Sequence, residues 1–194
     1  MDSEFRYIDI STTNLAGIQD VFKNVIKVET NYVPFSNFIR VIYCHIPNSE
    51  SKEYRIMNVR TGDVIESIFR HKDEKKPFFI YVPFKGKEYI VTSTFPGAFS
   101  IVSCTDSKTY DRTLEIDGKK AIPIKASAHI KSNDKNEDKY VDITFLCKFD
   151  SKDGEAEYKN ITIKLSNMCT CELFSNMIVE NAELSEEDQI NGWI

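Results

Sequence analysis

Residues 77–104 read PFFIYVPFKGKEYIVTSTFPGAFSIVSC, the most apolar and β-branched stretch of this 194-residue chain. The run 78–84 is apolar at consecutive positions, which is typical of a strand that is covered on both faces and lies inside a sheet. Gly86 allows the positive φ that a tight turn needs, so the alternating run 89–95 is expected to return as a hairpin partner.

Pro96-Gly97 interrupts this ladder, and the apolar run 99–104 is expected to start a third strand. Pro83 has no amide hydrogen, so we expect a bulge or a sheet edge at that position. The stretch therefore predicts three consecutive strands around which the rest of the chain packs.

The second half of the chain alternates apolar and polar residues, the pattern of strands with one buried and one solvated face. Asp117-Gly118 is a strong hairpin signal between positions 114–116 and 122–130, and Pro123 again implies an edge or a bulge. Further elements are expected as strands over 141–149 and 161–165 and as a strand or short helix over 173–184.

The first half predicts one clear helix, because apolar residues recur at helical spacing over residues 13–27. Residues 38–59 read as a hairpin that turns at 47–49. Residues 63–71 are ambiguous: they begin with a capping-box pattern, yet Thr61-Gly62 also suits a turn into a strand. We favour a short helix there.

These patterns predict a mainly β fold, an antiparallel β-sandwich or a closed β-barrel of about nine or ten strands. One N-terminal helix (13–27) and a short second helix (63–71) accompany the strands. The length and the 41% hydrophobic content suffice for one core, so we expect a single β-rich domain over residues 1–184. Residues 185–194 are expected to form an acidic C-terminal segment that ends in Trp193-Ile194.

The net charge of −5 is concentrated near the C-terminus, where residues 172–194 hold six acidic and no basic side chains. The rest of the chain has 25 basic and 24 acidic residues, a balance that argues against a strongly electrostatic grip on nucleic acid. Five cysteines, most of them in apolar runs, fit a reducing compartment, and no signal sequence or membrane span is evident. We expect a cytoplasmic protein without a membrane partner.

Metal binding has two candidate sets of residues. Cys169 and Cys171 would share one face of a strand, but a structural zinc site needs four ligands, and of Cys44 and His45 only one could join them. Three acidic loops (106–111, 134–138 and 150–155) could bind calcium together, although each also carries lysine. Buried cysteines and solvated hairpin tips are the favoured interpretations, and we expect no cofactor or metal.

A metal-dependent hydrolase is a further hypothesis, with Asp142 and Glu157 as metal-holding carboxylates and Lys159 stabilising charge. A cross-strand ion pair facing solvent is the simpler interpretation of these residues. The chain contains no glycine-rich phosphate loop, nucleophile elbow or dinucleotide fingerprint, which favours a non-enzymatic protein.

Nucleic-acid binding is suggested by aromatic residues interleaved with lysine, as on barrels that hold single strands by stacking and phosphate contacts. The acidic end with Trp193-Ile194 resembles the tails of single-stranded-DNA-binding proteins, which recruit partners. The candidate nucleic-acid contacts are Lys75, Lys76, Phe79, Tyr81, Lys85 and Lys87.

Taken together, the residues favour a non-enzymatic protein-interaction or assembly module of cytoplasmic or viral type. Its expected partner is another protein or a second copy of the chain, and Trp193 and Ile194 are the expected contact residues. The alternatives are a single-stranded nucleic-acid-binding protein of the oligonucleotide-binding type and the hydrolase that uses Asp142, Glu157 and Lys159.

Overall fold

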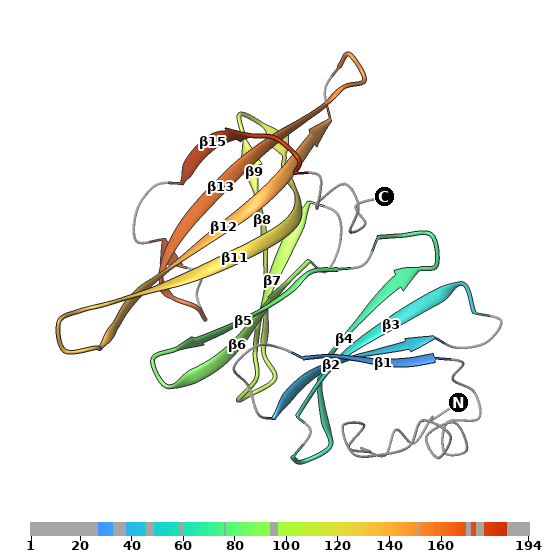
Figure 1. Cartoon of the computed structure of the whole chain (residues 1–194), viewed down its shortest axis with the longest axis vertical. Coiled ribbons are helices and arrows are strands. Elements are labelled where there is room, and N and C mark those ends of the chain that lie inside the picture. The colour runs from blue at the N-terminus through green and yellow to red at the C-terminus, as the bar shows by residue number, and fades with distance from the viewer. Residues whose placement is uncertain are drawn as a thin grey trace. The chain divides into compact units, whose positions relative to one another are not determined.

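The computed structural model describes residues 27–32, 38–45, 49–58, 60–75, 77–93, 97–150, 152–169, 172–173 and 177–185. Within these residues every regular element is a β-strand and every strand pairing is antiparallel (Figure 1). The chain divides into two compact units, residues 1–74 and 75–194. The mainly β, antiparallel prediction is therefore confirmed.

The first unit contains one four-stranded sheet in the order β1-β2-β3-β4. The predicted hairpin over 38–59 is confirmed, because β2 and β3 pair along their whole length. The side chains of Val41, Ile56 and Met57 are fully buried in this sheet. Its strands are β1 (Lys27–Tyr32), β2 (Ile39–His45), β3 (Ser51–Asn58) and β4 (Asp63–His71).

The short helix predicted over 63–71 is wrong, since these residues form β4 and pair with β3. The turn before β4 explains the outcome: Gly62 has a φ of 79°, and the Asn58 side-chain oxygen accepts the amide hydrogens of Arg60 and Thr61. This turn returns the chain against β3, and cross-strand pairs such as Tyr54 with Ile68 then outweigh the local capping pattern.

The N-terminal helix predicted over 13–27 lies outside the described residues, except for Lys27, which begins β1. The segment 185–194 also lies outside them except for its first residue, so Trp193 and Ile194 have no structural description. Both remain predictions.

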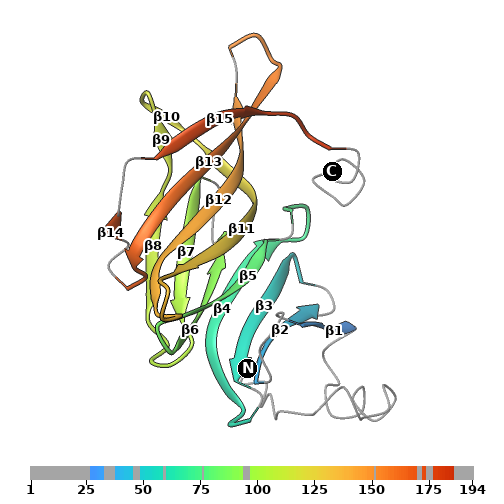
Figure 2. The same ribbon diagram turned by 60° about the vertical axis from the view of Figure 1, so that its left-hand side comes forward.

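The second unit contains a four-stranded and a five-stranded sheet, whose layers Figure 2 shows, and one short two-stranded pairing. One sheet follows the chain in the order β5-β6-β7-β8. The other has the order β11-β12-β13-β14, with β15 also paired to β13. The strands are β5 (Phe79–Phe84), β6 (Lys87–Thr92), β7 (Ala98–Ser103), β8 (Thr109–Thr113), β11 (Ile122–Ser132), β12 (Asp138–Asp150), β13 (Ala156–Asn167), β14 (Glu172–Leu173) and β15 (Ile178–Ala182).

One buried core cluster draws residues from both of these sheets, which explains why they lie as two layers. Alternate residues of β12 belong to this cluster, and the core residues of β13 pair with them across the sheet. The ring of Phe145 lies 4.6 Å from that of Phe99 on β7 and 6.2 Å from that of Phe78, measured between centroids. No sheet in the described residues closes into a barrel.

The stretch 77–104 forms three consecutive strands as predicted. The strand that is most buried is not the predicted one. All six residues of β7 are buried, whereas β5 lies at the edge of its sheet. The prediction that residues 78–84 sit inside a sheet is therefore wrong. The edge expected at Pro83 is confirmed, because a residue without an amide hydrogen is tolerated where no neighbour needs that bond.

Two tight turns have the left-handed backbone that their sequences require. Lys85 and Gly86 have φ values of 50° and 73°, and Asp117 and Gly118 have values of 50° and 75°. Both central residues of a type I′ turn need positive φ, which is why a glycine occupies the second position each time.

The hairpin expected around Asp117-Gly118 is only two residue pairs long, between β9 (Glu115–Ile116) and β10 (Lys119–Lys120). The chain then continues into β11, which pairs with β12 instead. The predicted feature at Pro123 is confirmed, because the β11–β12 register shifts between Pro123 and Lys125 and β11 is an edge strand. Pairings as short as β9–β10 and β14 also raise the strand number above the predicted nine or ten.

Candidate interaction surfaces

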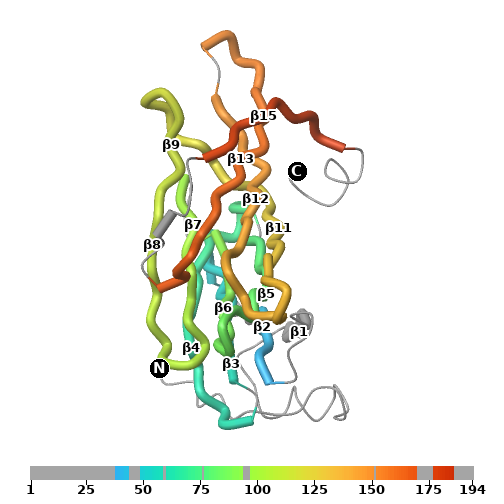
Figure 3. The backbone as a smooth tube through the Cα atoms, turned by 90° about the vertical axis from the view of Figure 1, so that its left-hand side faces the viewer, coloured from blue at the N-terminus to red at the C-terminus, as the bar shows by residue number. Residues whose placement is uncertain are grey.

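Three consecutive apolar side chains are exposed where the chain enters β15. Met177, Ile178 and Val179 are 38%, 53% and 40% exposed. On one side β15 pairs with β13, from Ile178 with Thr162 to Ala182 with Tyr158. Figure 3 shows the backbone tubes of these two strands. On its other side no strand pairing occurs within the described residues. β15 is therefore an apolar edge strand.

The exposed residues of β15 lie on both faces of the sheet. Val179 pairs with Ile161, whose side chain belongs to the buried core, whereas Ile178 pairs with Thr162 on the opposite face. The Thr162 hydroxyl oxygen lies 2.9 Å from that of Thr144 on the next strand. The apolar edge is thus not confined to one side of the sheet.

A cavity of about 580 Å³ adjoins the C-terminal half of β15. The residues that line it come from the start of β13, from β15 and from the segment that follows. They are Ala156, Glu157, Tyr158, Asn181, Ala182, Glu183 and Leu184. The edge strand is therefore flanked by a concave surface with two carboxylates.

The predicted nucleic-acid residues are spread over β5, its turn and the preceding segment. Phe79 and Tyr81 are half-buried on β5, and the Tyr81 hydroxyl donates a hydrogen bond of 2.8 Å to Glu88 Oε1. Lys85 lies in the turn, where its Nζ donates to the Ser166 carbonyl at 3.2 Å.

The other predicted nucleic-acid residues are Lys75, Lys76 and Lys87. Lys87 begins β6 and is exposed, Lys75 is exposed before β5, and Lys76 lies outside the described residues. The backbone amide of Lys85 also donates to Asp138 Oδ2 at 2.8 Å, so this turn is held to the start of β12. Binding of nucleic acid by this group stays a prediction.

A second cavity, of about 400 Å³, is lined by two lysines and is named the lysine pocket. It is lined by Gly97, Lys119, Lys120, Ile122, Phe149 and Asp150. Lys148 Nζ lies 3.8 Å from Asp150 Oδ1, and Lys159 Nζ lies 5.7 Å from the centre of the Phe149 ring. Sequence reasoning missed this group because its members come from separate strands and only cross-strand pairing brings them together.

The hydrolase residues are not brought together by the register of β12 and β13. Asp142 pairs with Lys164, whereas Lys159 pairs with Cys147. Five residues of β13 separate Lys159 from Lys164, which is about 16 Å along a strand. Lys159 instead forms an ion pair of 3.4 Å with Glu157 on its own strand, so the expected cross-strand pair between Asp142 and Lys159 does not form.

The surroundings of Asp142 differ from those that a metal-holding carboxylate requires. It pairs with His129 on β11 and Lys164 on β13, so it stands between two basic residue types. Its Oδ1 atom is buried and lacks a hydrogen-bond partner within the described part of the chain.

The cysteine and calcium candidates give no assembled ligand set in the residues that the structure describes: no three His, Cys, Asp or Glu side chains there are placed to share a metal ion. Cys169 Sγ lies 3.5 Å from the Tyr89 hydroxyl. Burial first and this hydrogen bond second raise the pKa of Tyr89. The side chains of Cys44, His45 and Cys171 lie outside the description.

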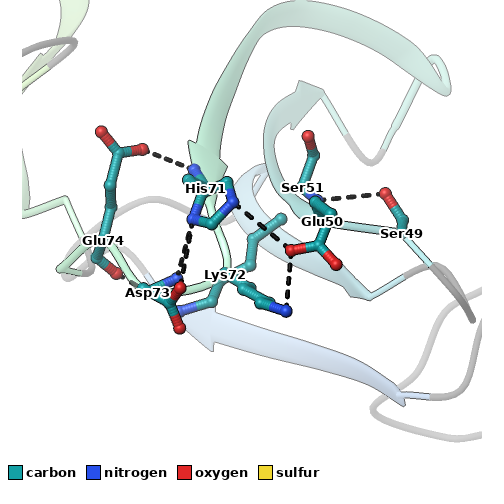
Figure 4. A network of polar contacts seen from close by, with 8 residues as sticks. Ser49, Glu50, Ser51, His71, Lys72, Asp73 and Glu74 are labelled. Carbon is teal, nitrogen blue, oxygen red and sulfur yellow. Dashed lines mark hydrogen bonds and ion pairs between the residues drawn. The ribbon is translucent and has the colours of Figure 1, made fainter.

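A polar network at the end of the β3–β4 hairpin surrounds His71 (Figure 4). His71 Nε2 lies 3.4 Å from Glu50 Oε2, and its Nδ1 lies 3.5 Å from Asp73 Oδ2. Lys72 Nζ lies 2.7 Å from the same Glu50 oxygen. These side chains are about half or more exposed, so each pair contributes only about 0–1 kcal/mol to stability.

Among the described residues no helix has the length and apolar character needed to cross a membrane. Comparison of the chain with protein-family models, with curated proteins and with solved structures finds no match.

Proposed function

We propose that this protein is a non-enzymatic assembly module, built on a β-sandwich formed by the two sheets of the second unit. It associates with a second copy of itself through β15. The single observation that supports the proposal most is the run of three exposed apolar residues, Met177 to Val179, which leads into the edge strand β15. Large exposed apolar residues on an unpaired edge are uncommon in monomers, because such an edge is a template for pairing.

The charges on the two edges of the same sheet argue for a second copy as the partner. β15 carries Glu180 and is followed by Glu183, whereas the opposite edge strand, β11, carries Lys125 and Lys131. Pairing β15 with another β15 would bring glutamates together, and pairing β11 with β11 would bring lysines together. Pairing β15 of one copy with β11 of the next places opposite charges side by side.

Strand addition of this kind supplies main-chain hydrogen bonds, while the exposed apolar side chains leave water. Each apolar side chain that becomes fully buried contributes about 1.5–3 kcal/mol before the cost of association is subtracted. Because β15 and β11 differ in charge, contacts between them join unlike edges of two copies and are head-to-tail.

The proposal is tested by light scattering coupled to size-exclusion chromatography over a range of protein concentrations. We expect the wild-type chain to show a mass above that of the monomer, increasing with concentration, and Val179→Asp to be monomeric. Val64→Asp is the matched control, since Val64 is also a strand valine and is 43% exposed against 40% for Val179.

A charge reversal tests the choice of partner edge. Glu180→Lys should weaken association, and adding Lys125→Glu and Lys131→Glu to the same chain should restore it. A wild-type chain that stays monomeric at the highest soluble concentration would contradict the proposal. Equal loss of association in Val64→Asp and Val179→Asp would contradict the assignment to β15.

A further inference from the structure

The lysine pocket gathers positive charge at one end of the β12–β13 pair. Lys119 and Lys120 line it from β10, and Lys148 stands beside it, ion-paired with the lining carboxylate of Asp150 at 3.8 Å. Lys159 Nζ lies 5.7 Å from the centre of the ring of Phe149, a lining residue, although Lys159 itself does not line the pocket. The charged residues of the lining are two lysines and one carboxylate, so the lining has a net positive charge.

The charge of Lys75 interacts with that of Lys148, which stands beside the pocket. The pKa of Lys75 is lowered, first by partial burial and then by the positive charge of Lys148. Two ammonium groups that repel one another in this way gain from an anion placed between them, because the anion offsets both the repulsion and the loss of water.

The walls of the pocket favour a compact anion rather than an extended one. Its volume of about 400 Å³ falls within the range of small-molecule sites. Ile122 and Phe149 form an apolar part of the lining, and the stem of Lys120 lies against Gly97, since a Cβ at Gly97 would stand 3.6 Å from Lys120 Cδ, an ordinary contact distance. Lysine ammonium groups at the rim of an apolar cavity bind phosphate oxygens as point charges.

We propose that the lysine pocket binds a small anion that carries two or more phosphate groups. Lys120 contacts the phosphate oxygens, Lys119 adds positive charge from the opposite face of β10, and Lys148 shields the anion from Asp150. This function is separate from the association through β15, and neither depends on the other.

Isothermal titration calorimetry of the full chain with inorganic tripolyphosphate tests the proposal at low and at moderate ionic strength. We expect saturable binding that weakens with salt and falls at least about tenfold in Lys119→Ala/Lys120→Ala. Asp150→Asn should bind more tightly than the wild type, by about twofold to fivefold, because it removes the one carboxylate in the lining. A gain of affinity also separates the proposed role from a folding defect.

Lys135→Ala/Lys139→Ala is the matched control, because it removes the same charge from exposed lysines at the other end of β12. Lys139 precedes Asp150 by 11 residues, or about 36 Å along the strand. We expect this control to bind like the wild type. Equal loss in both double variants, or no binding of tripolyphosphate, would overturn the proposal.

A labelled oligothymidylate of about ten nucleotides distinguishes the source of the phosphate. We expect tripolyphosphate to displace the oligonucleotide or to bind alone. Binding of the oligonucleotide that Lys119→Ala/Lys120→Ala abolishes, without any binding of tripolyphosphate, would overturn the assignment to a small anion.

Discussion

Cys147 illustrates how one buried residue ties the fold to solution conditions. Its side chain is completely buried on the core face of β12, and burial raises the pKa of the thiol from 9.0 to about 12. Burial, and then the charge of Glu88, raise the pKa of Cys104 to about 12 as well. Both thiols therefore stay protonated in the folded chain at pH values where an unfolded chain would ionise them.

This difference predicts a loss of stability in alkali. The folded pKa is raised, so the stabilising effect is fully present below pH 9 and is lost as the pH rises towards about 12. Each pH unit in that interval lowers the free energy of unfolding by up to about 1.4 kcal/mol per thiol. Urea unfolding at about pH 8 and about pH 11 measures the change.

Cys147→Ala provides the control, since it removes one of the two thiols. We expect the variant to be less stable at about pH 8 because of the space it leaves, but to lose less stability than the wild type on going to about pH 11. The same loss in both proteins would show that the buried thiol is not responsible.

Single residues were predictable where local backbone chemistry decides the structure. Gly86 and Gly118 were expected in tight turns, and both adopt the positive φ that such turns need. Pro83 and Pro123 were expected at an edge or a bulge because neither can donate a backbone hydrogen bond, and both lie on edge strands. These outcomes depend on covalent structure and not on distant neighbours.

At the scale of elements, the aromatic contact between β12 and β7 joins the two sheets of the second unit. Phe145 is fully buried and its ring lies 4.6 Å from that of Phe99. Because a cavity at this position would be lined by rigid strands, the surrounding side chains have little freedom to fill it.

We predict that Phe145→Ala lowers the free energy of unfolding by about 3–5 kcal/mol. Phe69→Ala is the control, since Phe69 is 62% exposed on β4 and its removal should cost less than about 0.5 kcal/mol. Chemical denaturation of both variants measures the difference. Similar effects of the two substitutions would contradict the described packing.

The type of an element was predictable where apolar and polar residues alternate over a long run, as along β12 and β13. The strands that lie beside each element were not predictable. Residues 63–71 became β4 because pairing with β3 overrode a capping pattern that spans only four residues. β5 reads as an internal strand, yet it lies at a sheet edge, and its own sequence does not encode which strand lies beside it. Sheet order depends on contacts between distant segments.

At the scale of the whole molecule, the chain divides into two compact units, and the single domain that the sequence predicts stays a prediction. Each unit offers one sensitive position. In the first, Arg55 Nε donates to Glu53 Oε1 at 2.6 Å, and the Ser67 hydroxyl donates to the same oxygen at 3.2 Å. Glu53 is buried, so removing its cationic partner is strongly destabilising.

We predict that Arg55→Ala, like Phe145→Ala in the second unit, shifts one shared thermal transition in differential scanning calorimetry. Removing one partner of a mostly buried pair costs about 3 kcal/mol or more. Two separate transitions, each shifted by only one of the variants, would contradict the single-domain prediction.

The candidate surfaces were less predictable than the fold. The sequence predicted contacts at Trp193 and Ile194, which lie outside the described residues, and it did not single out the exposed side chains of Ile178 and Val179. The lysine pocket could not be found from spacing, because Lys75, the pair on β10 and Lys148 are far apart in sequence. Charges meet there only after strands have paired.

The position of β15 and β11 at opposite margins of one sheet gives any row of copies a direction. One tip of such a row would always offer glutamates, and the other would always offer lysines. Growth at the two tips would then be unequal, and a subunit that is defective at a single margin would join the row and stop its extension. Even a small fraction of such defective subunits would therefore limit the length that the rows reach.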